Sequence, residues 1–126
     1  MFSHVMLGAD DLDVSKKFYD ATLGALGMKP GFADGNGRVF YMSPGGSFAI
    51  SKPIDGGPAS CANGGTVGFA ASSPEQADAW HQAGVANGGT TCEDPPGVRE
   101  GGLGKLYLAY LRDPAGNKLC ALHRMA

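Results

Sequence analysis

Residues 4–27, HVMLGADDLDVSKKFYDATLGALG, recur in the second half of the chain as TVGFAASSPEQADAWHQAGVANGG (66–89), with no gap between the two copies. In both copies an apolar run leads to a residue that can cap a helix, Asp11 or Ser73, and the segment ends at glycine. A repeat of this length predicts that the protein contains two copies of one folding unit.

Each copy predicts one amphipathic helix. In the first copy, apolar residues follow Asp11 at the i, i+4, i+7 and i+11 spacing that one helical face requires. These residues are Val14, Phe18, Ala21 and Ala25. In the second copy, Ser73, Pro74 and Gln76 are typical of a capping box, in which the serine and glutamine side chains satisfy free backbone N–H groups.

The segments that follow the two helices also align. FYMSPGGSFAIS (40–51) matches YLRDPAGNKLCA (110–121), and each is typical of a strand, a Pro/Gly turn and a second strand. The predicted strands are RVFYMS (38–43), SFAISK (47–52), KLYLAYL (105–111) and, interrupted by proline and glycine, MKPGF (28–32), with a hairpin tip at GNGR (35–38).

The predicted fold class is therefore α+β, built from two βαβββ modules. We expect a single domain over residues 1–126, with module 1 at about 1–56, a linker at 57–64 and module 2 at about 65–126. A chain of 126 residues has the size of one ordinary domain.

Charge and hydropathy exclude several classes of partner. The formal net charge of −2 lacks the excess of basic residues that nucleic acids and anionic membrane surfaces attract. No apolar run approaches the length of a membrane span, and the start of the chain lacks a basic signal-peptide region. Cys61, Cys92 and Cys120 are odd in number and widely spaced, which favours the reducing cytoplasm and free thiols.

Three motifs together resemble a known family. They are DLDVSKKFYDATLGALGM (11–28), LRDPAGNKL (111–119) and the Pro-Gly-x-Arg sequence at 96–99. Over nearly its whole length the chain resembles the vicinal oxygen chelate superfamily of glyoxalase I, bleomycin-resistance proteins and extradiol dioxygenases, and within it the small glyoxalase-like proteins. The resemblance implies that the curved sheets of the two modules form a cup. It also implies that metal-dependent members hold a cation at four positions in that cup.

Those four positions correspond here to His4, Thr66, Cys120 and either Ile50 or Ser51. Divalent cations prefer imidazole and carboxylate ligands, and only His4 is of that type. Cys120 takes the place of the family's usual glutamate. Since a catalytic zinc needs three protein ligands, we expect a degenerate metal site and no cofactor, with a divalent metal held through His4 as the alternative.

Arg99, Tyr107 and Cys120 are further candidates for a functional role. Arg99 lies in CEDPPGVREGG (92–102), which we expect to be a mobile flap that presents the guanidinium to an anionic ligand or leaves it solvated. Tyr107 is expected either to donate a hydrogen bond in the cup or to lie in the core. Cys120 is expected to be a small buried residue or, beside Lys118, a reactive thiol.

Alternation along the last strand limits what Cys120 can contact. Side chains of Lys118, Cys120 and Leu122 should share one face, and those of Leu119, Ala121 and His123 the other. A Cys–His dyad between Cys120 and His123 is therefore not expected.

Three functions stay open. The favoured one is a glyoxalase-like protein that binds a small molecule. The alternatives are a metal-dependent lyase, isomerase or dioxygenase of the glyoxalase type, acting on a small carbonyl or anionic substrate, and a sequestering protein of the bleomycin-resistance type. Whether the chain is an enzyme is left open, including a metal-free enzyme that uses His4, Arg99, Tyr107 or Cys120 on a carbonyl or anionic substrate. An open cup leaves sheet edges and an apolar concavity uncovered, so a homodimer is expected.

Overall fold

The computed structural model describes residues 1–125. Module 1 contains β1 (His4–Gly8), α1 (Leu12–Ala25), β2 (Phe32–Ala33), β3 (Arg38–Ser43) and β4 (Gly46–Ser51). Module 2 contains β5 (Val67–Ala70), α2 (Pro74–Ala86), β6 (Thr90–Thr91), β7 (Gly97–Gly101), β8 (Gly104–Arg112) and β9 (Lys118–Arg124). None of the helices in this part of the chain is both long and apolar enough to cross a membrane.

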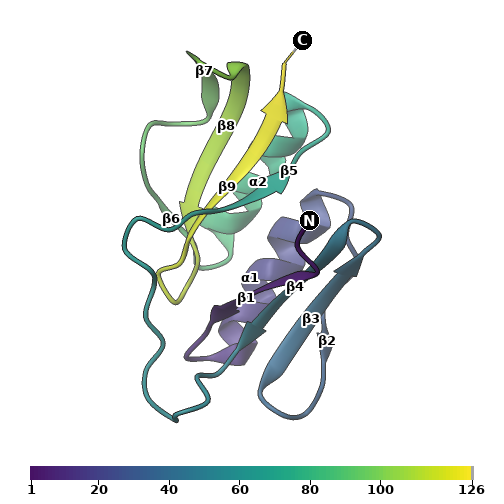
Figure 1. Cartoon of the computed structure of the whole chain (residues 1–126), viewed down its shortest axis with the longest axis vertical. Coiled ribbons are helices and arrows are strands. Elements are labelled where there is room, and N and C mark those ends of the chain that lie inside the picture. The colour runs from purple at the N-terminus through teal and green to yellow at the C-terminus, as the bar shows by residue number, and fades with distance from the viewer. Residues whose placement is uncertain (126) are drawn as a thin grey trace.

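The strands form two sheets that lie side by side (Figure 1). The first sheet has the order β1-β4-β3-β2, and the second has the order β5-β9-β8-β6, with β7 also paired to β8. In each sheet the first strand of the module pairs in parallel with the last, and the remaining pairs are antiparallel. Both helices lie behind the sheets in this view and leave the other face uncovered (Figure 1). The predicted α+β fold of two repeated modules is confirmed.

Both helices begin as their sequences predict. The Asp11 carboxylate accepts a hydrogen bond from the Val14 backbone N–H at 3.1 Å, and the Ser73 hydroxyl accepts one from the Gln76 N–H at 3.0 Å. The Gln76 side chain bonds one residue earlier than in a standard capping box, because it accepts from the N–H of Ser72 at 2.6 Å. The Ser73 cap therefore fixes where α2 starts.

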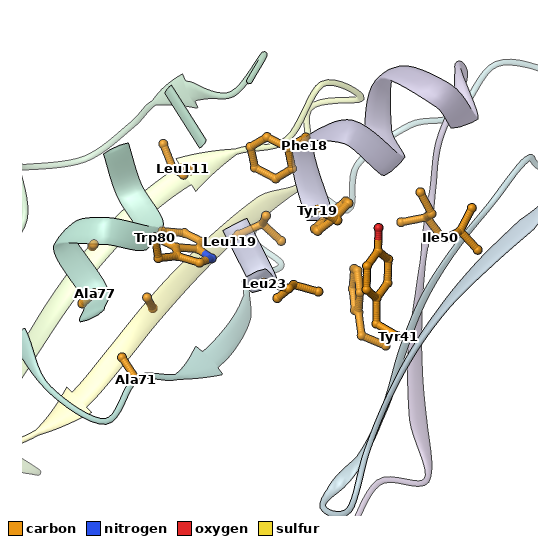
Figure 2. Close-up of a cluster of buried hydrophobic side chains, with 14 of the residues drawn as sticks. Phe18, Tyr19, Leu23, Tyr41, Ile50, Ala71, Ala77, Trp80, Leu111 and Leu119 are labelled. Carbon is orange, nitrogen blue, oxygen red and sulfur yellow. The ribbon is translucent and has the colours of Figure 1, made fainter. Parts of the chain in front are cut away.

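The two helices pack against each other over a shared core (Figure 2). Phe18 and Tyr19 come from α1 and Trp80 from α2, and all three side chains are fully buried. Gly84 allows the close approach of α2 to the second sheet, because a Cβ there would lie 2.2 Å from Leu111 Cδ1. The modules thus share one core rather than forming two.

The turn between β8 and β9 fastens module 2 to module 1. The buried Asp113 carboxylate accepts a hydrogen bond from the Tyr19 hydroxyl at 2.5 Å. In the same turn, Asn117 Nδ2 donates to the carbonyl of Gly8 at the end of β1, at 2.9 Å. The Asp-Pro-x-Gly-Asn motif therefore closes a hairpin and also joins the two halves of the chain.

The strand register corrects one of the four cup positions. Phe40 pairs with Ala49 in module 1, and Tyr110 pairs with Cys120 in module 2, so Ala49 is the counterpart of Cys120. The second turn holds one residue more than the first, which an ungapped alignment across the turn cannot detect. A slip of one residue moves a side chain to the opposite face of a sheet. Ile50 accordingly faces the helices and is fully buried.

Candidate functional site

The side of the sheets opposite the helices, here called the open face, carries His4, Arg99 and Cys120 among the candidate residues. Side chains alternate along a strand, and those of Leu119 and Ala121 lie on the face opposite Cys120, as predicted. That face packs in the core. The open face of the first sheet is formed by His4, Met6, Gly8, Phe32, Arg38, Phe40, Met42, Ser47, Ala49 and Ser51. The open face of the second sheet is formed by Gly68, Ala70, Arg99, Leu106, Leu108, Tyr110, Arg112, Lys118, Cys120 and Leu122.

His4 lines a cavity of about 400 Å³ between β1 and β5. Its Nδ1 lies 2.8 Å from the hydroxyl of Ser3, so a short hydrogen bond orients the ring. The walls come from both modules and are mostly apolar. They include Phe2, Val5, Leu26, Met28, Phe48, Val67 and Phe69. This cavity places the His4 imidazole beside space that a small molecule can fill.

Cys120 lies on the same open face but is buried. Burial raises the pKa of its thiol, and the Glu93 carboxylate raises it further, although the Lys118 ammonium acts in the opposite direction. Lys118 is itself paired with Glu93 and lies 5.1 Å from the centre of the Tyr110 ring. The thiol is therefore protonated at neutral pH, which is the unreactive form.

The four cup positions do not fit a divalent metal. After the register correction they are His4, Ala49, Thr66 and Cys120, and the methyl group of Ala49 cannot coordinate. Throughout residues 1–125, no three His, Cys, Asp or Glu side chains gather where they could hold a metal ion. Ser51, the other alternative, does lie on the open face, but its hydroxyl donates to the carbonyl of Lys52 at 2.8 Å.

The Arg99 side chain folds back on the loop that precedes β7. One guanidinium nitrogen, Nη2, donates to the carbonyls of Asp94 and Pro95, each at 3.1 Å. Residues 97–101, expected to be part of a mobile flap, instead form β7 and pair with β8. Arg99 lines none of the cavities described here, because its donors are turned back toward the loop that precedes it.

Tyr107 and His123 face the helices rather than the open face. The Tyr107 hydroxyl donates to Asp78 of α2 at 2.7 Å, and this hydrogen bond raises the pKa of the phenol. His123 Nδ1 lies 3.0 Å from the carbonyl oxygen of Ala71. His123 therefore lies across the sheet from Cys120, as the alternation of side chains predicted.

Arg38 lines a second cavity and was not among the candidate residues predicted from the sequence. It lies opposite Ser51 in the register and lines a cavity of about 490 Å³ near the linker. Alternation in RVFYMS could have placed it on the same face as Phe40 and Met42. Its position at the end of the Gly-Asn-Gly tip instead suggested a turn residue, and the path of the linker has no signal in the sequence.

Comparison with known families and structures gives the chain its class. The chain belongs to the Glyoxalase/Bleomycin resistance protein/Dioxygenase superfamily, whose family model matches residues 1–121. It is 68% identical to a glyoxalase/bleomycin resistance protein from Albidiferax ferrireducens T118, with a TM-score of 0.95 over 98% of both chains.

More distant structures share the fold alone. A glyoxalase-related enzyme from Fulvimarina pelagi is 19% identical, with a TM-score of 0.70, over 98% of this chain and 88% of its own. A lactoylglutathione lyase from Agrobacterium tumefaciens is 22% identical, with a TM-score of 0.67, over 98% of this chain and 92% of its own. No curated protein matches the sequence significantly.

Proposed function

We propose that this protein binds a small molecule in the His4 cavity and that its metal site is degenerate. The observation that carries the proposal is the content of the four cup positions, where only His4 and Cys120 bear atoms that coordinate transition metals well. Two such ligands are fewer than a catalytic zinc requires from the protein. The raised pKa of the Cys120 thiol weakens coordination further, because a metal binds the thiolate.

The walls of the His4 cavity favour a compact and largely apolar ligand. Aromatic and aliphatic side chains from both modules supply most of its surface, and a volume of about 400 Å³ lies within the range of small-molecule sites. The polar groups are few, and the His4 imidazole is the chief one. It can form one directed hydrogen bond with the ligand through Nε2, since Nδ1 is already bonded to Ser3.

Two measurements on untagged protein test the proposal. Elemental analysis should find no stoichiometric nickel, zinc or iron, and native mass spectrometry should find any bound small molecule that survives purification. A ligand found in this way should bind His4→Ala more weakly, while His81→Gln on α2, outside the cavity, should bind as the wild type does. One tightly held metal per chain, lost in His4→Ala, would contradict the proposal.

The exposed apolar residues of the first sheet favour a homodimer. Met6, Phe32 and Met42 all lie on its open face and are 40%, 69% and 71% exposed. Apolar patches of this kind commonly mark an interface. A second copy that covers them could enclose a ligand between chains, which is the arrangement of the sequestering alternative. Light scattering should give the mass of two chains, and Met42→Lys should shift it toward one.

The cysteines favour a reducing compartment such as the cytoplasm. Cys61 is exposed, Cys92 is half-buried and Cys120 is buried, and all three are free thiols. An exposed free thiol is poorly suited to an oxidising environment. Fractionation of the native cells with an antibody against the protein tests this placement.

A further inference from the structure

A second cavity lies at the opposite end of β1 from His4. Its floor is one row of the first sheet, because Ser51 pairs with Arg38 on one side and with Gly8 on the other. His4 and Gly8 are four residues apart on the strand, about 13 Å at the usual strand rise. The two cavities share no lining residue.

The linker forms the wall of this second cavity. The Ala59 backbone N–H donates to the Asp10 carboxylate at 2.6 Å, and the Lys52 N–H donates to the Gly37 carbonyl at 2.9 Å. Gly8 lets the linker approach closely, since a Cβ at that position would lie 3.2 Å from the Cβ of Ala59. These contacts hold the linker over the end of the sheet. The cavity is therefore formed by ordered parts of the chain.

Arg38 differs from the other three arginines of the chain. Arg99, Arg112 and Arg124 each donate to backbone carbonyls of neighbouring loops. The guanidinium of Arg38, by contrast, has no hydrogen-bond partner and no carboxylate within 4.0 Å among residues 1–125. Arg38 is nevertheless half-buried, and it lines the cavity. A half-buried cation without a partner is suited to an incoming anion.

The remaining lining residues narrow the chemistry of that anion. Lys52 and Asp55 also line the cavity, so its charged groups are two cations and one carboxylate. The Asp55 carboxylate accepts from the Gly57 N–H at 2.9 Å and would repel a dianion more strongly than a monoanion. Apolar surface is supplied by Met6, Leu7, Pro53, Ile54 and Pro58.

We propose that this cavity is a second ligand site, which binds the carboxylate of a small organic acid with an apolar body. The planar fork of Arg38 matches a carboxylate with two parallel N–H donors. The Ser51 hydroxyl lies beside it and can turn from the Lys52 carbonyl to the ligand. The apolar body then packs on Met6 and against the linker. The site goes beyond the proposed function, because it neither contains His4 nor needs a ligand in the His4 cavity.

A pair of probes with the same shape tests the proposal. 2-Naphthoate carries the carboxylate and 2-naphthamide replaces it with a neutral amide. Titration followed by calorimetry and by amide chemical shifts should show that naphthoate binds at least about tenfold more tightly, the effect of a hydrogen bond to a charged group. The shifts should centre on Gly8, Ser51 and Ala59. Equal binding of the two probes, or no binding of naphthoate at millimolar concentration, would overturn the proposal.

Matched variants identify the group responsible. Arg38→Gln should lose about tenfold or more in naphthoate affinity, and Arg38→Lys should lose less because it keeps the charge but not the fork. Arg124→Gln, on the other sheet, should bind naphthoate as the wild type does. His4→Ala should do the same, which separates this site from the His4 cavity. Unchanged affinity in a folded Arg38→Gln would reject the site.

Discussion

The two modules share the same arrangement of helix and strands, but the side chains on their open faces differ in character. In module 1 the open face exposes Phe32 and Met42 and holds Arg38 without a partner. In module 2 the cations are already engaged, as Lys118 pairs with Glu93 and Arg99 closes a loop. A repeated fold can thus keep one half available for ligands while the other half satisfies its own polar groups. We infer that module 1 supplies most of the binding surface.

The largest effect is expected from restoring ligands at the four cup positions. At these positions each module holds one side chain that coordinates metals well, His4 in module 1 and Cys120 in module 2. The triple variant Ala49→Glu, Thr66→His and Cys120→Glu should gain nickel or zinc affinity by about a thousandfold, roughly 4 kcal/mol, if the four positions converge. Isothermal calorimetry on protein with native circular dichroism measures it.

The register itself is tested by a matched variant. In the matched variant the first glutamate replaces Ser51 instead of Ala49. Ser51 lies on the same face of β4 but two residues further along the strand, so it does not match the position of Cys120 in module 2. That variant should gain much less affinity. Equal gains from the two triple variants would mean that Ala49 is not the fourth position.

The next largest effect is on the free energy of unfolding, and it should differ between the β8–β9 turn and the β3–β4 turn. Asp113 is 3% exposed, and its carboxylate accepts from the Tyr19 hydroxyl, from the Ala115 N–H and from two donors of Asn117. Asp113→Ala leaves these donors unsatisfied and should lower the free energy of unfolding by about 3 kcal/mol. The counterpart in module 1 is Ser43, whose hydroxyl donates to the Gly46 carbonyl at an exposed site. Ser43→Ala should cost less than about 0.5 kcal/mol in urea denaturation.

The sequence predicted the features of the fold that depend on local interactions, and it did not predict those that depend on contacts between distant residues. The Asp11 and Ser73 helix caps and the Pro/Gly turns depend on neighbouring residues, and they were predicted correctly. The apolar face of α1 was predicted only in part, because Phe18 is buried as expected but Val14 is exposed. The helix instead buries Tyr19 and Leu23 beside Phe18. The hydrogen bond between Tyr19 and Asp113 joins residues far apart in the chain, so no local sequence pattern predicts it. Ile50 was misplaced because one extra residue in a turn reverses a strand's two faces. The Arg38 cavity depends on where the linker runs, which only the packing of Ala59 on Gly8 reveals.

A smaller effect separates two helical glycines, one in each module. Gly84 of α2 has Phe18, Thr22 and Leu111 within contact distance of an added Cβ, the last at 2.2 Å. Gly84→Ala should therefore overpack the core and lower stability by about 1–3 kcal/mol. Nothing lies within 4 Å of an added Cβ at Gly24 of α1, so Gly24→Ala should raise stability by about 0.5–1 kcal/mol. Thermal melts that move in the same direction for both variants would contradict this packing.

The smallest effect concerns Tyr19 and His81, which hold the same position in the repeated helices. Burial is the main cause that raises the pKa of Tyr19 well above its ordinary value, so Tyr19 does not titrate near neutrality. Burial lowers the pKa of His81 below 6.5, although the nearby Asp78 carboxylate opposes that shift. The unfolded chain therefore binds the His81 proton more readily than the folded one does. Stability from this group is fully present above about pH 6.5 and is lost as the pH falls through the folded pKa.

His81→Gln should remove that part of the acid dependence. Urea denaturation of the wild type should show unfolding free energy falling between pH 7 and pH 5 by a few tenths of a kcal/mol more than in the variant, since His81 is partly solvated and the effect is screened. Above pH 7 the two curves should run parallel, because the imidazole is then neutral in both the folded and the unfolded chain. Parallel curves down to pH 5 as well would show that the burial of this histidine has no consequence for folding. Tyr19 and His81 would then differ in the size and packing of their side chains but not in any effect of titration on stability.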